Sequence, residues 1–427
     1  MRFSPLTTRP GRSLAAPLAL VLATTLLLAC SATPDNVVRI YSSIPLQGAS
    51  GADNLTIVHA IRMALDQRNG RAGTLKVEYI SLDDSTKSRG KWDAATEEAN
   101  ARRAAADPLA VAYIGTVNSG AAKVSIPILN RVQLAMISPA NTYPGLTKAN
   151  GALSSEPYIY YPLGPDSRNY CRVLPSDDLQ GAAGALYAQQ KLGAKSVYVL
   201  DDTELYGHGV ASVFAAKAAE IGLNVLGGPE GIETREGDPL KGGDPRFSAA
   251  RTKTAQDVAA KKPDVVYFGG ATENHPGELL QFLRQAGFTG PFLGPDGIAE
   301  PAFVKEAAAK GPGPGTVYAT LPGASADKLV GKGAEWLKSF KQLYPKDNVA
   351  QYTHYGYETM NVVLDAIAKV GKRDRAAVLA ALRATKNVQG ILGVWSFDAN
   401  CDTSLTAISV QALSNGVFTF KEFAPAP

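Results

Sequence analysis

The sequence predicts an α/β fold with two doubly wound lobes, each built on a parallel sheet. Two observations support this prediction. Short apolar runs typical of strands alternate with amphipathic runs of helical period along most of the chain. The alternation comes in two runs of about four units each, separated near residues 145–172 by a segment rich in Tyr, Pro, Gly and Ser. Repeated strand–helix units form parallel sheets with helices on both faces.

The first run is marked by clear helix boundaries. Apolar residues recur at helical spacing from Leu55 to Leu65, and Asn69-Gly70 stops the pattern. Asp107-Pro108 ends a second helical pattern, and Pro127 must lie in the first turn of a third or kink it. The expected strands are 37–42, 75–81, 111–115 and 134–138, and the expected helices are 55–67, 91–106 and 123–130.

The second run follows the same scheme and leads into a helical region. Its expected strands are 196–200, 224–226, 265–270 and 291–294, and its expected helices are 210–221, 247–261 and 278–286. The charged, Gly-rich segment 230–244 is predicted to be a surface loop. After a Gly/Pro cluster at 311–315 and a break near Pro322 come helical patterns at 334–344, 359–370 and 375–384, then strand patterns at 406–412 and 417–420.

The composition is that of a soluble globular protein and excludes several function classes. The chain has 427 residues, of which 45% are hydrophobic and 19% charged. A net charge of +4 is small for a nucleic-acid-binding surface, so we expect no nucleic-acid partner. Three cysteines exclude a Cys₄ zinc site, and four scattered histidines argue against a histidine-built one. We therefore expect no metal and no cofactor.

The motifs of common enzymes are absent from the sequence, and we predict no catalytic residues. There is no GxSxG nucleophile elbow, no GxxxxGK[ST] phosphate loop and no HExxH zinc motif. Ser119 lies in Thr-Val-Asn-Ser-Gly, which does not fit the elbow. The acidic pairs 83–84, 177–178 and 201–202 flank strands or turns, where solvated carboxylates are common.

The first thirty residues have the pattern of an export signal. Arg2, Arg9 and Arg12 precede an uncharged stretch that is too short for a membrane-spanning helix. It ends in Leu27-Leu28-Ala29-Cys30, which resembles the lipobox of bacterial lipoproteins. We expect residues 1–29 to be a signal peptide, Cys30 to be lipidated and 30–35 to be a tether. The alternative is a plain signal peptide with an accidental cysteine.

The expected export has two consequences for the rest of the chain. Without the three signal arginines its net charge falls from +4 to +1, so the basicity belongs to the signal. We expect an extracytoplasmic protein, soluble but held to the membrane by lipid. In that compartment Cys171 and Cys401 either pair or remain buried free thiols.

Several segments, in this order, resemble the type I periplasmic binding proteins. They are Ile44–Gly48 (IPLQG), Ile114-Gly115 with Asn118-Ser119, Met136–Thr142 (MISPANT), Leu205-Tyr206-Gly207, Tyr267–Gly270 (YFGG) and Leu293–Gly297 (LGPDG). The similarity covers nearly the whole expected mature chain. The branch it resembles most is the leucine/isoleucine/valine-binding proteins, which are the substrate-binding components of branched-chain amino acid ABC importers.

The resemblance implies a domain arrangement and a set of partners. Lobe I would comprise 36–172 and 323–395, and lobe II would comprise 173–322 and 396–427, joined by three hinge crossings. Cys171 and Cys401 would both lie near crossings, which favours a disulfide between them. The protein would be a monomer that closes over an amino acid and then docks on a membrane permease, without catalysis.

The resemblance also implies a set of ligand-binding residues. Ser119, Ala140 and Thr142 match positions that hold the carboxylate and amino group of an amino acid, with Asn141 beside them. Asp296 matches the acidic partner of the ligand's ammonium group, and Tyr206 matches an aromatic residue that packs on the ligand. The residues alone also permit a helix cap at Ser119, an ordinary turn at 139–142, a turn carboxylate at Asp296 and a core tyrosine.

Two departures from the family pattern predict a ligand more polar than leucine. Asp53 stands where an aromatic residue often covers the ligand, and 271–275 (ATENH) replaces a segment that often contains a second tyrosine. The side chain of Asn141 would add a further polar group. The open alternatives are a binder or sensor of short amides, urea or aromatic carboxylates and, in a third class, a periplasmic hydrolase.

Overall fold

The computed structural model describes residues 36–149, 153–231, 245–309, 313 and 315–427. Residues 35–427 form one compact unit. The expected signal peptide, the lipobox Cys30, the tether and most of the 230–244 loop lie outside the described residues. Within the described part, none of the helices has the length and apolar character needed to cross a bilayer.

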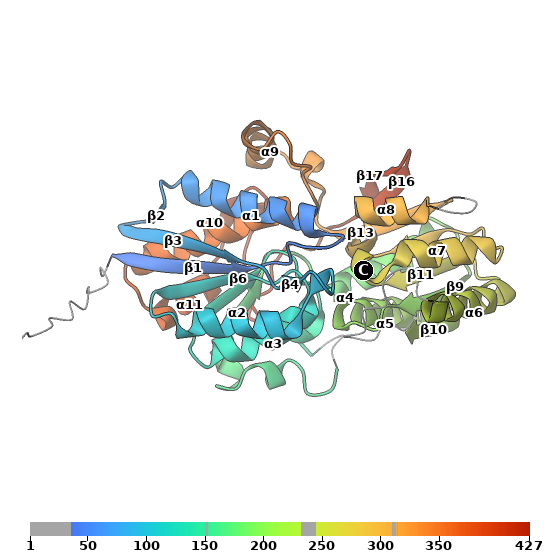
Figure 1. The fold of residues 1–427 in the computed structure, drawn as a ribbon, viewed down its shortest axis with the longest axis horizontal. Coiled ribbons are helices and arrows are strands. Elements are labelled where there is room, and N and C mark those ends of the chain that lie inside the picture. Colours follow the sequence, from blue (N-terminus) through green and yellow to red (C-terminus); the bar gives the residue numbers. More distant parts are fainter. Residues whose placement is uncertain (1–35, 150–152, 232–244, 310–312, 314) are drawn as a thin grey trace, which may run out of the picture. The chain divides into compact units, whose positions relative to one another are not determined.

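The first sheet has the strand order β2-β3-β1-β6-β7-β8, and all its pairs are parallel except β2 with β3 (Figure 1). Helices α1, α10 and α11 pack on one face and α2 and α3 on the other. The strands are β1 (Val37–Ser43), β2 (Arg71–Ala72), β3 (Leu75–Leu82), β6 (Ala110–Gly115), β7 (Ala135–Ser138) and β8 (Tyr170–Arg172); the helices are α1 (Gly51–Asp66), α2 (Ala94–Ala106), α3 (Ser119–Asn130), α10 (Thr353–Val370) and α11 (Arg375–Arg383).

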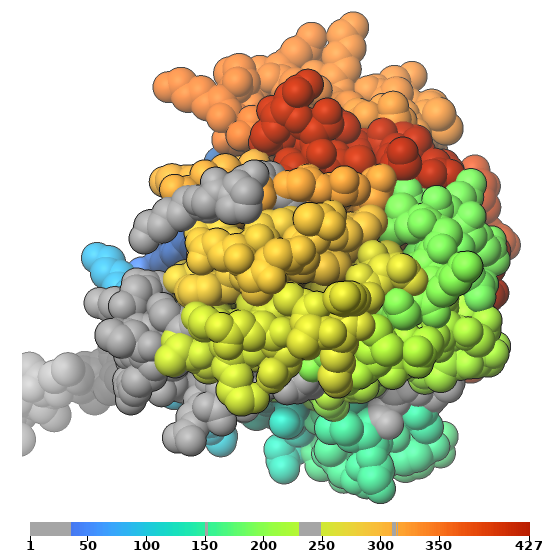
Figure 2. All heavy atoms as spheres, turned by 90° about the vertical axis from the view of Figure 1, so that its right-hand side faces the viewer, coloured from blue at the N-terminus to red at the C-terminus, as the bar shows by residue number. Residues whose placement is uncertain are grey.

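The second sheet has the order β10-β9-β11-β12-β13-β16-β17, parallel up to β13 and antiparallel beyond it. Helices α4 and α5 pack on one face, and α6, α7 and α8 on the other. Figure 2 looks onto this lobe, where α6 and α7 cover the sheet. The strands are β9 (Ser196–Asp201), β10 (Asn224–Gly231), β11 (Val265–Gly269), β12 (Phe292–Gly294), β13 (Val317–Pro322), β16 (Ile408–Ser414) and β17 (Val417–Phe423); the helices are α4 (Asp177–Gln190), α5 (Leu205–Glu220), α6 (Pro245–Lys261), α7 (Pro276–Gln285) and α8 (Pro301–Ala307).

Two structural pairs lie where the chain passes between the sheets. Cys171 and Cys401 are joined by a disulfide within the first core. Next to it, the buried guanidinium of Arg172 donates to the Asp402 carboxylate at 2.6 Å. The chain enters the second sheet only at Ile408, so the segment just before it still belongs to the first core.

Three small elements complete the described part. Helix α9 (Lys332–Leu343) packs Trp336 and Phe340 against Ala60 and Met63 of α1. The other two are the hairpins β4 (Ser85–Thr86) with β5 (Lys91–Trp92), and β14 (Val388–Gly390) with β15 (Gly393–Trp395). Hairpin β4–β5 lies in the loop between β3 and α2, and its second strand supplies Lys91 and Trp92 to the contacts between the lobes.

Several elements differ from the expected ones for local physical reasons. The expected helix 91–106 begins at Ala94, because Lys91 and Trp92 form β5 and the Asp93 side chain accepts the Thr96 N–H at 3.0 Å as an N-cap. Helices α3, α5 and α10 begin four to six residues before the expected starts. Helix α4 was not predicted, because its GAAGALYA core is buried on nearly all sides and has no polar face.

Candidate ligand-binding site

A small cavity lies between the carboxyl ends of the strands of both sheets. Its volume is about 40 Å³, which is room for roughly three water molecules. Its walls come from loops that follow β1, β6 and β7 in the first sheet and β9, β11 and β12 in the second, the usual ligand position in open α/β sheets. The lining residues are Ser50, Asn54, Val117, Asn118, Ser119, Ala140, Thr142, Tyr206, Ala271, Glu273, Gly297, Glu300, Gln351 and Tyr352.

The loop between β6 and α3 forms one wall from the first lobe. Ser119 is the first residue of α3 and is 2% exposed. Its Oγ accepts the Tyr143 N–H at 3.4 Å. The N-cap of α3 is Asn118, whose side chain makes no cap hydrogen bond. The first turn of a helix carries partial positive charge on its N–H groups. This wall can therefore receive a carboxylate or another acceptor group.

The loop after β7 forms the adjoining wall. The N–H groups of Ala140 and Asn141 both donate to Ser138 Oγ, at 3.0 and 2.8 Å, which fixes the turn. Ala140 and Thr142 line the cavity, and the Thr142 carbonyl accepts the Asp177 N–H of α4 at 2.8 Å. The turn thus brings Thr142 to the same cavity as Ser119 and connects this wall to the second lobe.

The side chain of Asn141 does not line the cavity, contrary to the expectation that it adds a polar group there. Its Nδ2 donates to the Val117 carbonyl at 2.7 Å, and its Oδ1 accepts the Tyr170 hydroxyl at 3.0 Å. The residue is 0% exposed. Asn141 therefore holds the two neighbouring loops together from behind the wall.

Tyr206 supplies the aromatic surface of the second lobe. It lies in the first turn of α5, and its hydroxyl donates to Asp296 Oδ1 at 2.6 Å while accepting the Gly297 N–H at 3.1 Å. A Cβ atom at Gly297 would lie 2.5 Å from the Gly270 carbonyl oxygen and 3.0 Å from the Tyr206 ring. The Asp-Gly pair is thus needed for the tyrosine to sit against this turn.

Asp296 is buried beneath the cavity and is not among its lining residues. Its Oδ1 also accepts the Gln180 amide at 2.7 Å, and its Oδ2 accepts the Tyr352 hydroxyl. Burial raises the pKa of Asp296 to about 6. In the structure the carboxylate accepts hydrogen bonds from Tyr206 and Tyr352 and so orients both side chains. Tyr352 would have to move before Asp296 could pair directly with a ligand ammonium group. That pairing stays a prediction.

Two carboxylates that were not predicted as site residues from the sequence also line the cavity. Glu273 belongs to the 271–275 segment, and Glu300 precedes α8. Glu300 Oε2 accepts the Ser50 hydroxyl at 2.7 Å, a contact from the second lobe to the first. Burial raises the pKa of both, and Glu273 raises that of Glu300 further. The polar character of segment 271–275 was the only feature of the sequence that could have indicated Glu273 as a site residue. Nothing in the sequence indicated Glu300, because an acidic residue before Pro301 is typical of a helix start.

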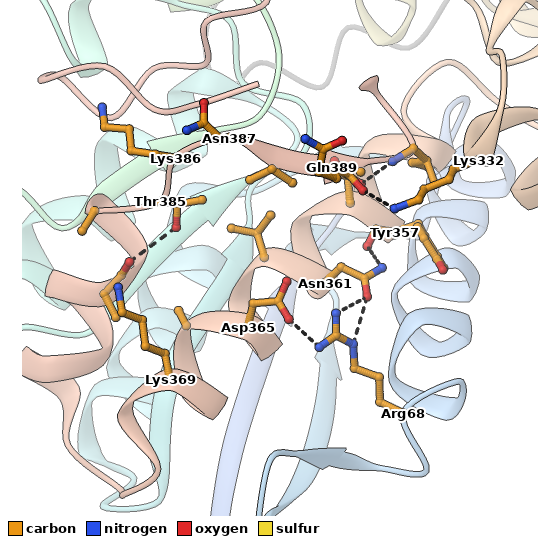
Figure 3. Close-up of a pocket in the computed structure, with 18 residues that line it drawn as sticks. Arg68, Lys332, Tyr357, Asn361, Asp365, Lys369, Thr385, Lys386, Asn387 and Gln389 are labelled. Atoms are coloured by element: carbon orange, nitrogen blue, oxygen red, sulfur yellow. Dashed lines mark hydrogen bonds and ion pairs between the residues drawn. The ribbon is translucent and has the colours of Figure 1, made fainter. Parts of the chain in front are cut away.

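Asp53 does not cover this cavity. It lines a neighbouring cavity of about 480 Å³, together with Ile57, Val304 and Val349 among others. The two cavities share Asn54, Glu300, Gln351 and Tyr352. A larger cavity of about 740 Å³ lies between α10, α11 and the β14–β15 hairpin (Figure 3). There Arg68 donates to Asn361 Oδ1 and to Asp365, at 2.9 and 2.6 Å. None of the residues predicted to bind a ligand lines that larger cavity.

Comparisons with known proteins agree with this architecture. The family model described as "Periplasmic binding protein" matches residues 38–411. The Leu/Ile/Val-binding protein BraC3 of Rhizobium johnstonii is 26% identical over 87% of this chain and 90% of its own length. An amino acid binding protein of Pseudomonas aeruginosa is 26% identical over 91% and 93%.

Solved structures show the same fold. The crystal structure of the leucine binding protein LivK from Thermotoga maritima has a TM-score of 0.74 and 26% identity, covering 91% of this chain and 98% of that one. A solute-binding protein from R. palustris in complex with benzoate has a TM-score of 0.68 and 18% identity, covering 92% and 97%. Members of this family are substrate-binding proteins rather than enzymes. The chain belongs to the type I periplasmic binding proteins, in the branch that includes the Leu/Ile/Val-binding proteins.

Proposed function

We propose that the protein is the extracytoplasmic solute-binding component of an ABC importer and captures an amino acid, branched-chain or related, between two closing lobes. The observation that carries this proposal is the cavity at the strand ends whose walls come from both lobes. Its position at the strand ends, and relatives named as amino acid binding proteins, support the same function. The ligand binds without any covalent step.

The size of the cavity implies that binding depends on lobe movement. A volume of about 40 Å³ admits no free amino acid, so the lobes must part before a ligand enters. We take the lobes as 36–172 with 323–395 and 173–322 with 396–427, although Phe397 and Cys401 of the last range pack in the core of the first sheet. The three crossings between them would act as the hinge, and contacts from both lobes to one ligand would stabilise the closed form.

The residues of the cavity suggest how an amino acid would be held. Ser119, Ala140 and Thr142 would receive the carboxylate through hydroxyl and backbone N–H groups. Tyr206 would pack on the ligand from the second lobe. Asp296 would fix the hydroxyl of Tyr206 and, once Tyr352 moves, add negative charge near the ligand's ammonium group.

The anchor and the partners follow from the same function. Cys30, lipidated after removal of residues 1–29, would hold the protein at the outer face of a bacterial membrane. The monomeric, closed and liganded form would then dock on the membrane permease. Retention at the membrane should be lost in a Cys30→Ser variant, which cannot form the thioether to lipid.

A second candidate function is binding or sensing of short amides, urea or aromatic carboxylates. The small volume of the cavity and the polar side chains among its lining residues, such as Asn118, Glu273 and Gln351, favour it. The benzoate-bound neighbour shows only that the same fold can hold such a ligand in another protein.

A thermal-shift screen of the purified protein tests both functions. The panel contains the common amino acids, acetamide, urea and benzoate. A ligand that binds only the folded state raises the melting temperature as its concentration exceeds Kd. Stabilisation by an amino acid, reduced in Ser119→Ala but unchanged in the control Thr385→Val at the larger cavity, supports the proposal. Stabilisation only by an amide, urea or benzoate overturns it in favour of the second function.

A further inference from the structure

We propose that this site selects a ligand with two cationic nitrogen groups, such as an amino acid with a cationic side chain, through Glu273 and Glu300. The inference rests on the proposed function and names the class of ligand that the cavity takes. It departs from the names of the relatives, which indicate apolar branched-chain ligands for those proteins.

The charge of the cavity wall is the first observation. Among the described residues that line it are two glutamates, and none is Lys, Arg or His. Lys91 lies close enough to lower the pKa of Glu273, but its ammonium group already contacts Glu204 and donates to Asn274 Oδ1 at 2.8 Å. Both glutamates are half-buried, and a carboxylate in such a position either takes up a proton or pairs with a cation. A ligand that brings positive charge is therefore favoured on this wall.

Orphaned polar atoms on the same wall are the second, independent observation. Asn118 Oδ1 and both amide atoms of Gln351 are buried and have no hydrogen-bond partner among the described residues. Both residues line the cavity. Buried polar groups are normally paired, so these amides indicate that a polar ligand completes the site. An apolar leucine side chain would leave them unsatisfied.

Charge balance distinguishes a ligand with two cations from one with a single cation. A neutral amino acid brings one carboxylate, for the start of α3 and Thr142, and one ammonium group. That single ammonium leaves one of the two glutamates without a counter-charge, and this glutamate must then take up a proton. A second cationic nitrogen on the side chain neutralises it without this proton uptake.

The test is isothermal titration calorimetry with paired ligands. L-Lysine and L-arginine are the cationic probes, and L-norleucine and L-leucine are the neutral ones. The wild type should bind a cationic probe at least tenfold more tightly than L-norleucine, which matches the L-lysine chain without its charge. Glu273→Gln and Glu300→Gln should each weaken cationic binding tenfold or more and leave neutral binding equal or tighter. Glu335→Gln, on the exposed face of α9, is the charge-matched control and should change neither.

The possible results separate this inference from the function on which it rests. Tighter binding of a neutral amino acid, unaffected by both glutamine variants, overturns the inference and leaves amino acid capture standing. Absence of binding by every amino acid overturns the proposed function itself. In Glu300→Gln the amide oxygen can still accept the Ser50 hydroxyl, and in Glu273→Gln it can still accept from the Asn118 side chain. Loss of binding with an unchanged melting temperature therefore reports on charge rather than folding.

Discussion

Lys91 and Glu204 form a nearly buried ion pair between the two lobes. The ammonium group lies on β5 of the first lobe, and the carboxylate belongs to the residue just before α5 of the second. Their side chains are 11% and 10% exposed. The Trp92 indole also donates to Glu204 Oε2, at 3.1 Å. Together with the hydrogen bond from Ser50 to Glu300, this pair connects loops on either side of the cavity.

Removing the cation of this pair should favour the open form. In Lys91→Met, Glu204 is left as a buried charge without its partner, which typically costs about 3–5 kcal/mol. The closed form bears that cost and an open, solvated form does not. We expect a larger radius of gyration by small-angle X-ray scattering without ligand and ligand affinity reduced tenfold or more. Lys372→Met, which removes an exposed pair with Asp374, is the control; equal behaviour of the two variants would contradict the role of Lys91.

The hydroxyl groups on the first-lobe wall should contribute to ligand affinity more than to stability. Ser119→Ala and Thr142→Val each remove the hydroxyl of a residue that lines the cavity. Each should weaken binding about tenfold, since a hydrogen bond to a charged group contributes about 1.5–3 kcal/mol. Calorimetry with the best ligand of the thermal-shift screen measures this. A loss of melting temperature with unchanged affinity would instead make both residues structural.

The stability of the protein should fall as the pH rises from about 5 to 8. Burial raises the pKa of Glu97 and of Asp202 to about 7, from ordinary values of 4.5 and 3.8. The folded protein therefore keeps protons that the unfolded chain has already lost in this range, so the free energy of unfolding decreases with pH and levels off above 7. For Glu97 the effect is on the order of 2 kcal/mol.

Urea unfolding at pH 5, 6 and 8 measures this dependence. Glu97→Gln should make the dependence of the unfolding free energy on pH less steep, because the titrating group is gone. The Tyr113 hydroxyl, which donates to Glu97 at 2.8 Å, can donate to the glutamine oxygen instead. The same pH dependence in the wild type and in Glu97→Gln would contradict protonation of Glu97 in the folded state.

Loss of the disulfide should lower global stability. Cys171 and Cys401 are 230 residues apart in sequence, so their link restricts the unfolded chain strongly. A Cys171→Ala, Cys401→Ala double variant should lose about 2–5 kcal/mol in urea unfolding. Adding a reductant to the wild type should lower its stability to the same degree, and leave the double variant unchanged. Equal stability of oxidised and reduced wild type would contradict this prediction.

The elements that could be predicted from the sequence are those with a regular pattern of apolar residues. Apolar strands and amphipathic helices recur along the chain, and the turns that follow β6, β7 and β12 could be placed by motif. Helix α4 could not, because small buried residues on every side give no helical period. The direction of the Asn141 side chain could not either, because its partners Val117 and Tyr170 are distant in sequence.

The acidic character of the cavity was also beyond the sequence. Glu273 and Glu300 are ordinary loop carboxylates until the fold brings them to one wall. Likewise, Asp296 was recognised as a site residue, but its three hydrogen-bonding partners come from α4, α5 and the start of α10. Only the tertiary structure shows that they occupy both of its oxygens.

A crystal structure with the ligand that gives the largest thermal shift tests the central claim most directly. That claim is that one solute is held by both lobes in the cavity at the strand ends. We predict ligand atoms within hydrogen-bonding distance of Ser119 and Thr142 on one side and in contact with Tyr206 or Glu300 on the other. A ligand bound to one lobe alone, or in the cavity beside Arg68 and Asp365, would contradict the account.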